Sequence, residues 1–266
     1  QDDEGKEFPE LGVGLTPNIS EQFADAAIDL ISRKSDKPFF LHLNFTSPHD
    51  PRLLPKGYEN AYPPDKMPLP ENFQPTPDIT LNTRDERLLP KPLSPDDVRA
   101  ELSAYYAQIS HMDAQIGRVL ESLQRSGKAD NTIIVFVSDH GLALGSHGLV
   151  GKQNLYDDTL LVPCILVGPG IPVNAQRAGL VYLRDISATI LSLCQVGIPS
   201  EWDGQDLTPL LNGKVSQVHP YVVGYYIDES RCVRTEEWKL ITYPKEKKDQ
   251  LFNLRQDPLE KNNLAG

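Results

Sequence analysis

The 266-residue sequence contains only three cysteines, two methionines and two tryptophans. Cys164, Cys194 and Cys232 form no closely spaced pairs, and their odd number leaves at least one thiol unpaired, so a disulfide framework is excluded. No apolar run approaches the roughly 20 residues that a membrane-spanning helix needs. Basic residues are also few: 26 Lys and Arg against 37 Asp and Glu give a net charge of −11. That balance argues against nucleic acid or an anionic membrane as partners.

What is present favours a globular protein. Apolar residues make up 39% of the sequence and charged residues 24%, which is enough to build a sizeable core. Amphipathic periodicity predicts helices over 20–31, 94–127 and 185–194. Apolar or alternating runs predict strands over 39–45, 132–137, 162–167, 221–227 and 232–243, the last with a turn at 236–237.

The most informative segment is 138–154, which holds one Asp, two His, four Gly and one Lys. It follows the β-branched and aromatic run 132–137, which is typical of a strand buried on both faces of a parallel sheet. Asp139 and His140 would therefore lie just beyond the carboxyl end of a strand. Open α/β sheets bind their ligands at this position.

A second predicted strand, 39–45, ends in a similar way. It is followed directly by a short polar segment that contains His49 and Arg52. Each feature alone has an ordinary interpretation, because Asp, His and Gly are common turn residues and Lys152 could be a solvated loop lysine. Two strand ends that both carry such groups favour a site for a metal-bound anion.

These motifs and their order resemble the sulfatases of the alkaline-phosphatase-like superfamily, over about Ser20 to Leu264. The resemblance rests on residues 47–51 (Ser-Pro-His-Asp-Pro), 137–141 (Val-Ser-Asp-His-Gly), 144–148 (Leu-Gly-Ser-His-Gly), 151–156 (Gly-Lys-Gln-Asn-Leu-Tyr), Val162-Pro163, 234–240 and 251–264. It implies an α/β fold with a mostly parallel sheet sandwiched by helices. We expect that fold to be incomplete at the N-terminus.

Two parts are expected on this basis. Residues 1–204 would form a partial sulfatase α/β domain, with a long proline-rich rim loop at 51–95. Residues 205–266, where the pattern changes to a period of two, would form a small C-terminal antiparallel sheet subdomain.

The resemblance also implies roles for single residues. Asp139 and His140 would bind a divalent metal ion, with Ca²⁺ the first choice. Because an imidazole nitrogen also suits Mn²⁺ or Zn²⁺, these remain alternatives. His49 and Lys152 would contact the sulfate of the substrate and serve catalysis. His147 would either bind the substrate or support the groups that do. Arg52 is a further substrate-binding candidate because of its place in the rim loop.

The formylglycine nucleophile of sulfatases derives from a Cys/Ser-x-Pro/Ala-x-Arg motif, and the sequence contains none. The Asp-Asp metal pair that opens the family's domain is not recognisable either. Asp2-Asp3 has no apolar strand before it, Asp96-Asp97 fits the first turn of a helix, and Asp157-Asp158 lies in a helix-like stretch. We therefore expect the nucleophile and the other carboxylates on a missing N-terminal segment or chain, and the present chain alone to be catalytically incompetent.

Three functional interpretations stay open at this point. The first is a sulfatase portion that hydrolyses the sulfate ester of a small molecule or carbohydrate, in the periplasm or outside the cell as the resemblance implies. The second is a phosphodiesterase or phosphonate hydrolase of the same superfamily. The third is an inactive fragment. Upstream sequence would separate the first two, since Cys-x-Pro-x-Arg there favours a sulfatase and an unmodified Ser or Thr favours the second.

A doubly wound sheet that lacks its first strand exposes a strand edge and helix faces, and such surfaces associate. We expect the chain to be stable only beside the missing part. Size-exclusion chromatography and thermal unfolding of the chain expressed alone test this. A monodisperse monomer that unfolds cooperatively would contradict the expectation.

Overall fold

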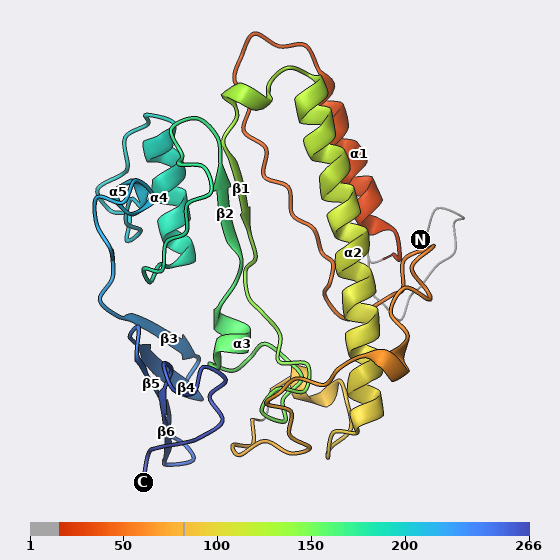
Figure 1. Ribbon diagram of the computed structural model, residues 1–266, viewed down its shortest axis with the longest axis vertical. Coiled ribbons are helices and arrows are strands. Elements are labelled where there is room, and N and C mark those ends of the chain that lie inside the picture. The colour runs from red at the N-terminus through yellow and green to blue at the C-terminus, as the bar shows by residue number, and fades with distance from the viewer. Residues whose placement is uncertain (1–15, 82) are drawn as a thin grey trace. The chain divides into compact units, whose positions relative to one another are not determined.

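Two long amphipathic segments become the paired helices of the first compact unit. The structure, a computed structural model, describes residues 16–81 and 83–266. Helices α1 (Ile19–Ser32) and α2 (Pro95–Arg125) lie side by side in the unit formed by Gln1–Leu69 and Ser94–Asn131 (Figure 1). Both were predicted from their periodicity.

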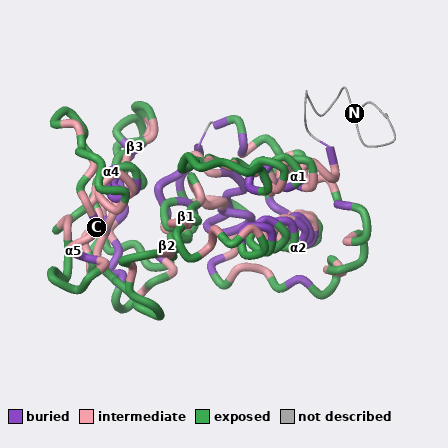
Figure 2. Tube along the Cα trace, turned by 90° about the horizontal axis from the view of Figure 1, so that it is seen from above, coloured by how far each residue is buried: buried purple, intermediate pink, exposed green. Residues whose placement is uncertain are grey.

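The contact between the two helices follows from small and branched apolar side chains. Ala24 and Ala27 of α1 are buried, and a stripe of α2 that includes Val98 and Leu102 is buried as well (Figure 2). Short alanine side chains let helix backbones approach closely. At the start of α2, the hydroxyl of Ser94 accepts hydrogen bonds from the backbone N–H groups of the two aspartates that follow Pro95, which satisfies donors that the helix itself leaves unpaired.

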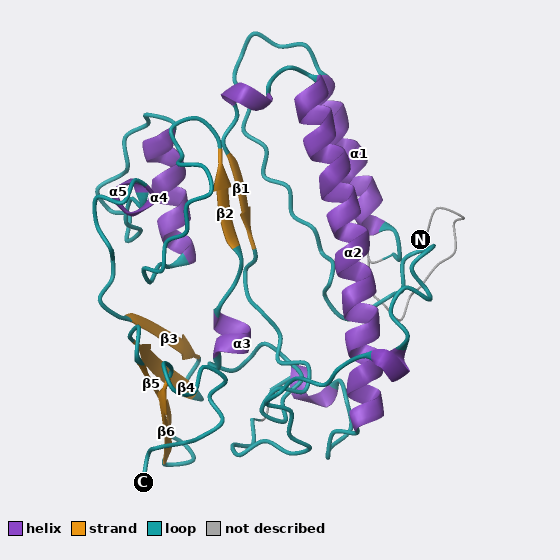
Figure 3. Ribbon diagram, in the orientation of Figure 1, coloured by secondary structure: helices purple, strands orange, loops and turns teal. Residues whose placement is uncertain are grey.

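The second unit consists of Pro70–Leu93 and Thr132–Gly266. Its first sheet has two strands, β1 (Ile134–Val137) and β2 (Cys164–Val167), and its helices are α3 (Asp157–Leu160), α4 (Leu183–Leu193) and α5 (Thr208–Leu211) (Figure 3). The short 3₁₀ turn Asp85–Arg87 also lies in this unit, whereas the 3₁₀ turns Pro64–Lys66 and Ala129–Asn131 belong to the first unit. The predicted positions of β1, β2 and α4 are confirmed.

The pairing of the predicted strands differs from our expectation. β1 and β2 pair antiparallel, with Ile134 opposite Val167 and Val137 opposite Cys164, where we predicted a parallel sheet around β1. The apolar run 39–45 is not a strand, and no parallel pair occurs in the described residues. A strand needs a neighbour for its backbone hydrogen bonds, and 39–45 has neither that nor burial, because Phe39 and Phe40 are exposed.

The C-terminal antiparallel sheet is confirmed. Its four strands occur in the spatial order β3 (Val222–Tyr226), β4 (Ser230–Arg234), β5 (Trp238–Tyr243) and β6 (Lys248–Asn253). Side chains alternate across it, so that Ile241, Tyr243 and Phe252 face the core while Tyr225 is exposed. The same core includes Leu149 of the segment 138–154, which we call the motif loop, and Leu155 and Tyr156 directly after it. The sheet and the motif loop therefore share one apolar cluster.

The proline-rich segment 51–95 is divided between the two units. Residues 51–69 belong to the first unit, and residues 70–93 belong to the second, where they reach the motif loop through hydrogen bonds described below. The expected division after residue 204 stays a prediction. No helix in the described part of the chain is long and apolar enough to span a membrane.

Phe252 supports the shared core with a fully buried ring. We expect Phe252→Ala to lower the free energy of unfolding by about 3–5 kcal/mol, because it removes a large apolar side chain and leaves a cavity. Denaturant unfolding of the protein that contains the N-terminal part measures the effect. Tyr225→Ala, at an exposed position of the same sheet, serves as the control and should change stability by less than about 0.5 kcal/mol.

Candidate active site

Asp139 and His140 lie together just after β1, as predicted. Asp139 Oδ2 is 3.4 Å from His140 Nε2, and Asp139 Oδ1 accepts a hydrogen bond from the His140 backbone N–H at 3.0 Å. His140 Nδ1 lies 2.9 Å from the carbonyl oxygen of Gly141. A proton on Nδ1 completes this contact, so Nε2 keeps its lone pair for a ligand on the Asp139 side.

This pair fits part of a metal site. Two adjacent ligands at about 2.1–2.4 Å from one ion are separated by roughly 3 Å, close to the observed distance between Oδ2 and Nε2. A backbone carbonyl that fixes the other imidazole nitrogen is a common support for a metal-bound histidine. Two ligands are not a complete site, and the residues that the structure describes contain no group of three His, Cys, Asp or Glu side chains that could hold a metal ion.

Two glycines in the loop are required by close contacts. A Cβ on Gly141 would lie 2.1 Å from the carbonyl oxygen of Asp158, and a Cβ on Gly151 would lie 2.1 Å from the Cβ of Asp85. Real Cβ atoms do not approach other atoms so closely. The residue after His140 and the residue before Lys152 therefore have to be glycine in this packing.

Two charged residues that we did not predict from the sequence, Glu86 and Lys91, hold the loop. The carboxylate of Glu86 accepts hydrogen bonds from the backbone N–H groups of Val150 and Gly151 at 3.0–3.1 Å. Lys91 pairs with Glu86 at 2.9 Å and donates to the Gly148 carbonyl at 2.6 Å. Glu86 and Lys91 lie far from the loop in sequence, within a proline-rich segment, and no periodicity marks them.

Lys152 is half-buried and lies between Gly151 and Gln153. The side-chain oxygen of Gln153 accepts a hydrogen bond from the backbone N–H of Asp85 at 3.3 Å. The residues on both sides of Lys152 are thus attached to the segment 85–86. Its predicted contact with a sulfate stays a prediction.

Within the loop, His147 is buried. Its ring stacks on Tyr156 with 3.8 Å between centroids, and its Nε2 lies 3.1 Å from Asn72 Nδ2. That amide also donates to Asp158 at 2.9 Å. Because Asn72 donates to it, Nε2 acts as an acceptor. This placement favours a supporting role for His147 over the alternative role on the substrate side.

A buried cluster of charges lies at the start of α3. Lys239 of β5 is fully buried and pairs with Asp157 at 2.8 Å and with Glu260 at 2.7 Å. Arg234 adds a second cation beside Asp157 at 3.1 Å. Burial alone would raise the pKa of Asp157, but Lys239 and Arg234 hold that pKa below its usual value. Burial raises the pKa of Glu260, although Lys239 opposes the shift.

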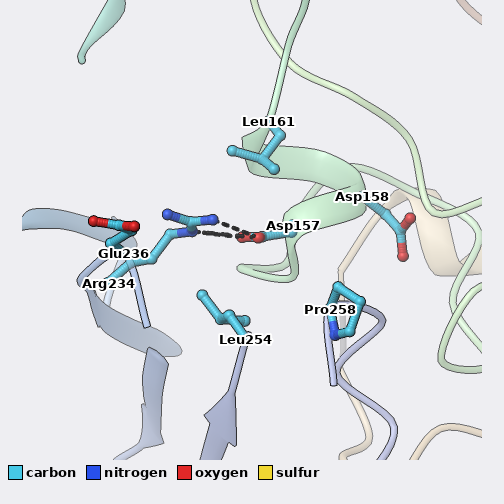
Figure 4. Close-up of a pocket in the computed structure, with 7 residues that line it drawn as sticks. All are labelled: Asp157, Asp158, Leu161, Arg234, Glu236, Leu254 and Pro258. Carbon is cyan, nitrogen blue, oxygen red and sulfur yellow. Dashed lines mark hydrogen bonds and ion pairs between the residues drawn. The ribbon is translucent and has the colours of Figure 1, made fainter. Parts of the chain in front are cut away.

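A polar cavity of about 500 Å³ opens beside this cluster. Figure 4 shows the guanidinium of Arg234 directed at Asp157, with Asp158 pointing away from that pair. None of the predicted site residues lines the cavity. Its lining residues are Asp157, Asp158, Leu161, Arg234, Glu236, Leu254 and Pro258.

His49 and Arg52 belong to the first unit. His49 Nδ1 lies 2.6 Å from the carbonyl oxygen of Asp50, and the His49 side chain is 39% exposed. Arg52 is 3% exposed, pairs with Glu101 and lies over the Tyr105 ring at 5.8 Å. The burial of its side chain favours a structural interpretation for Arg52, while His49 keeps access to solvent.

Comparison with known families agrees with the loop's chemistry. The sulfatase family model matches residues 5–196, and a model described as N-sulphoglucosamine sulphohydrolase, C-terminal, matches residues 145–266. The chain therefore belongs to the sulfatase family. Among curated proteins, it is 31% identical over 249 residues to an arylsulfatase of Clostridium perfringens, an alignment that covers 90% of this chain and 52% of that protein.

Solved structures show the same fold. One is a protein in complex with its substrate D-glucosamine-2-N,6-O-disulfate (TM-score 0.80, 21% identity, 93% of this chain and 65% of that chain). Another is a phosphonate monoester hydrolase of Agrobacterium radiobacter (TM-score 0.78, 22% identity, 99% of this chain and 62% of that chain). The alkaline-phosphatase-like fold class is thus confirmed. The chain spans about half the length of the curated relatives it matches.

The burial of His147 predicts a pH effect on stability. Burial lowers the pKa of His147 from its ordinary value of 6.5, with the Asp158 carboxylate partly opposing the shift. As pH falls below 6.5, the unfolded chain therefore binds a proton more readily than the folded chain, and stability falls. His147→Gln removes this contribution, so the variant should lose less stability than the unchanged protein between about pH 7.5 and pH 5.5.

Urea unfolding of the protein that contains the N-terminal part, at both pH values, measures this difference. His42→Gln is the matched control, because the His42 side chain is exposed, and it should leave the difference between the two pH values unchanged. An equal loss of stability in the His147 variant and the unchanged protein would contradict the account.

Proposed function

We propose that this chain supplies part of the active site of an enzyme that hydrolyses an organic sulfate ester, with a sulfated carbohydrate as the substrate. The observation that carries the proposal is the Asp139–His140 pair, whose Oδ2 and Nε2 atoms lie 3.4 Å apart in the loop that also presents Lys152. Family membership supports the ester class. The glucosamine disulfate bound to the structural relative supports a sugar.

Each residue would have a separate task. Asp139 and His140 would hold a divalent ion, with Ca²⁺ first and Mn²⁺ or Zn²⁺ as alternatives because of the imidazole. That ion would supply Lewis-acid stabilisation of charge on the sulfate oxygens. The ammonium of Lys152 would neutralise a further sulfate oxygen.

His49 would complete the reaction as a proton donor. Its side chain is partly exposed, and an imidazole can give a proton to the bridging oxygen as the alcohol leaves. The nucleophile would be a formylglycine, and it and the remaining metal ligands would be supplied by a separate N-terminal part of the protein.

Two substitutions test the assignment in the enzyme that contains the N-terminal part. Lys152→Ala should lower kcat/KM for an aryl sulfate by about 100- to 1000-fold, as expected when one donor to a developing anion is lost. Asp139→Asn should lower both activity and bound metal, which elemental analysis measures. Lys245→Ala, at a half-exposed lysine in a hairpin, is the matched control and should retain full activity.

The same assay separates sulfate from phosphorus chemistry, which the shared fold with a phosphonate monoester hydrolase makes necessary. We expect the aryl sulfate to react faster than an aryl phosphate or phosphonate. A preference for the phosphorus esters would favour the alternative function. Full activity of the Lys152 or Asp139 variant would refute the site.

A further inference from the structure

We infer that Glu86 is a positioning residue that sets the place of Lys152 in the active site, an inference that rests on the proposed function. Glu86 is 8% exposed and lies in the short 3₁₀ turn Asp85–Arg87. Its action is on the backbone immediately before the lysine.

The carboxylate of Glu86 binds the loop backbone through hydrogen bonds that we call the Glu86 clamp. Oε1 accepts from the N–H groups of Val150 at 3.1 Å and Gly151 at 3.0 Å, and Oε2 accepts from Val150 at 3.1 Å. Hydrogen bonds from backbone amides to a buried carboxylate are stronger than those between neutral groups. Lys91 neutralises the carboxylate and also binds the Gly148 carbonyl, so both partners act on the same loop.

Asp85 fixes the loop on the other side of Lys152. Its backbone N–H reaches the Gln153 side chain, and its own side chain fills the space that a Cβ on Gly151 would need. Arg84 pairs with Asp85 Oδ1 at 2.6 Å, whereas the buried Oδ2 has no hydrogen-bond partner among the residues that the structure describes. A buried carboxylate oxygen without a hydrogen bond costs stability.

These contacts restrict the Lys152 backbone from both directions. Gly151 is held by hydrogen bonds and by steric contact, and Gln153 is tied to the same short turn. Binding an anion orders both the flexible lysine side chain and the backbone that carries it. Because the backbone of Lys152 is already fixed, only the side chain has to be ordered during the reaction. A displacement of about 1 Å at such a group can cost about 100-fold in rate.

The test uses the enzyme that contains the N-terminal part. Glu86→Ala should lower kcat/KM for an aryl sulfate by about 10- to 100-fold, the range found when a residue that supports an active-site group is removed. Glu86→Gln keeps Oε1, which accepts both amide hydrogens, and should lose clearly less activity. Glu121→Ala is the matched control, since Glu121 makes only an exposed pair with Arg125 on α2, and it should keep full activity.

Hydrogen exchange, which does not depend on activity, separates a local loss of contacts in the loop from a general folding defect. Hydrogen exchange of the Val150 and Gly151 amides should accelerate in Glu86→Ala, while amides of β5 and β6 keep their protection. If the Ala variant does not fold, Glu86→Gln carries the test through its faster exchange at Val150, which loses the Oε2 contact. Unchanged exchange at both amides would overturn the inference.

A double-mutant cycle shows whether Glu86 acts through Lys152. In the Lys152→Ala background, Glu86→Ala should cause little further loss, because the group that it positions is gone. Losses that multiply in the double variant would contradict the inference. The two proposals fail separately: an active Lys152→Ala enzyme refutes the proposed site, whereas an inactive Lys152→Ala enzyme beside a fully active Glu86→Ala enzyme refutes the positioning role alone.

Discussion

The buried ammonium of Lys239 is the constraint on which the second unit depends. It comes from β5 and neutralises Asp157 at the start of α3 and Glu260 near the C-terminus. Glu260 also accepts the Asp157 backbone N–H at 2.7 Å, so three segments far apart in sequence meet at one charge. A buried charge that loses its partner is strongly destabilising, and the three segments therefore have to assemble together. The end of the motif loop is fixed by that assembly, because α3 begins directly after it.

The two ends of the motif loop differ in burial and in the kind of contact that holds them. Near β1, Asp139 and His140 are held only by local contacts with their neighbours, and the carboxylate of Asp139 is 84% exposed. Near α3, Glu86 and the Gly151 backbone form a buried arrangement. An exposed ligand pair can accept an ion and further ligands, whereas a buried clamp keeps a lysine in place. This division of roles fits the reaction that we propose, in which a metal ion and a cation share one anionic group.

Much of the fold could be predicted from periodicity, including both long helices and the C-terminal sheet. Asp139, His140 and Lys152 could be found because their residue types concentrate in one turn after an apolar run. The clamp by Glu86 and the Lys239 cluster could not, since Glu86 bonds to Val150 across 64 residues and Lys239 pairs with Asp157 across 82 residues, and no local pattern encodes such pairing. The strand expected at 39–45 was wrong for the same reason: apolar content is local, but a strand exists only with a neighbour. The burial of His147 and Arg52 could not be predicted from the sequence either.

In the function that we propose, these contacts would prepare the loop for one part of an anion site. The most direct test is a crystal structure of the enzyme that contains the N-terminal part, grown with inorganic sulfate and the metal ion. The account predicts sulfate within hydrogen-bonding distance of Lys152 Nζ and an ion bound by both Asp139 Oδ2 and His140 Nε2. An ion held without either residue, or sulfate bound with Lys152 directed elsewhere, would contradict it.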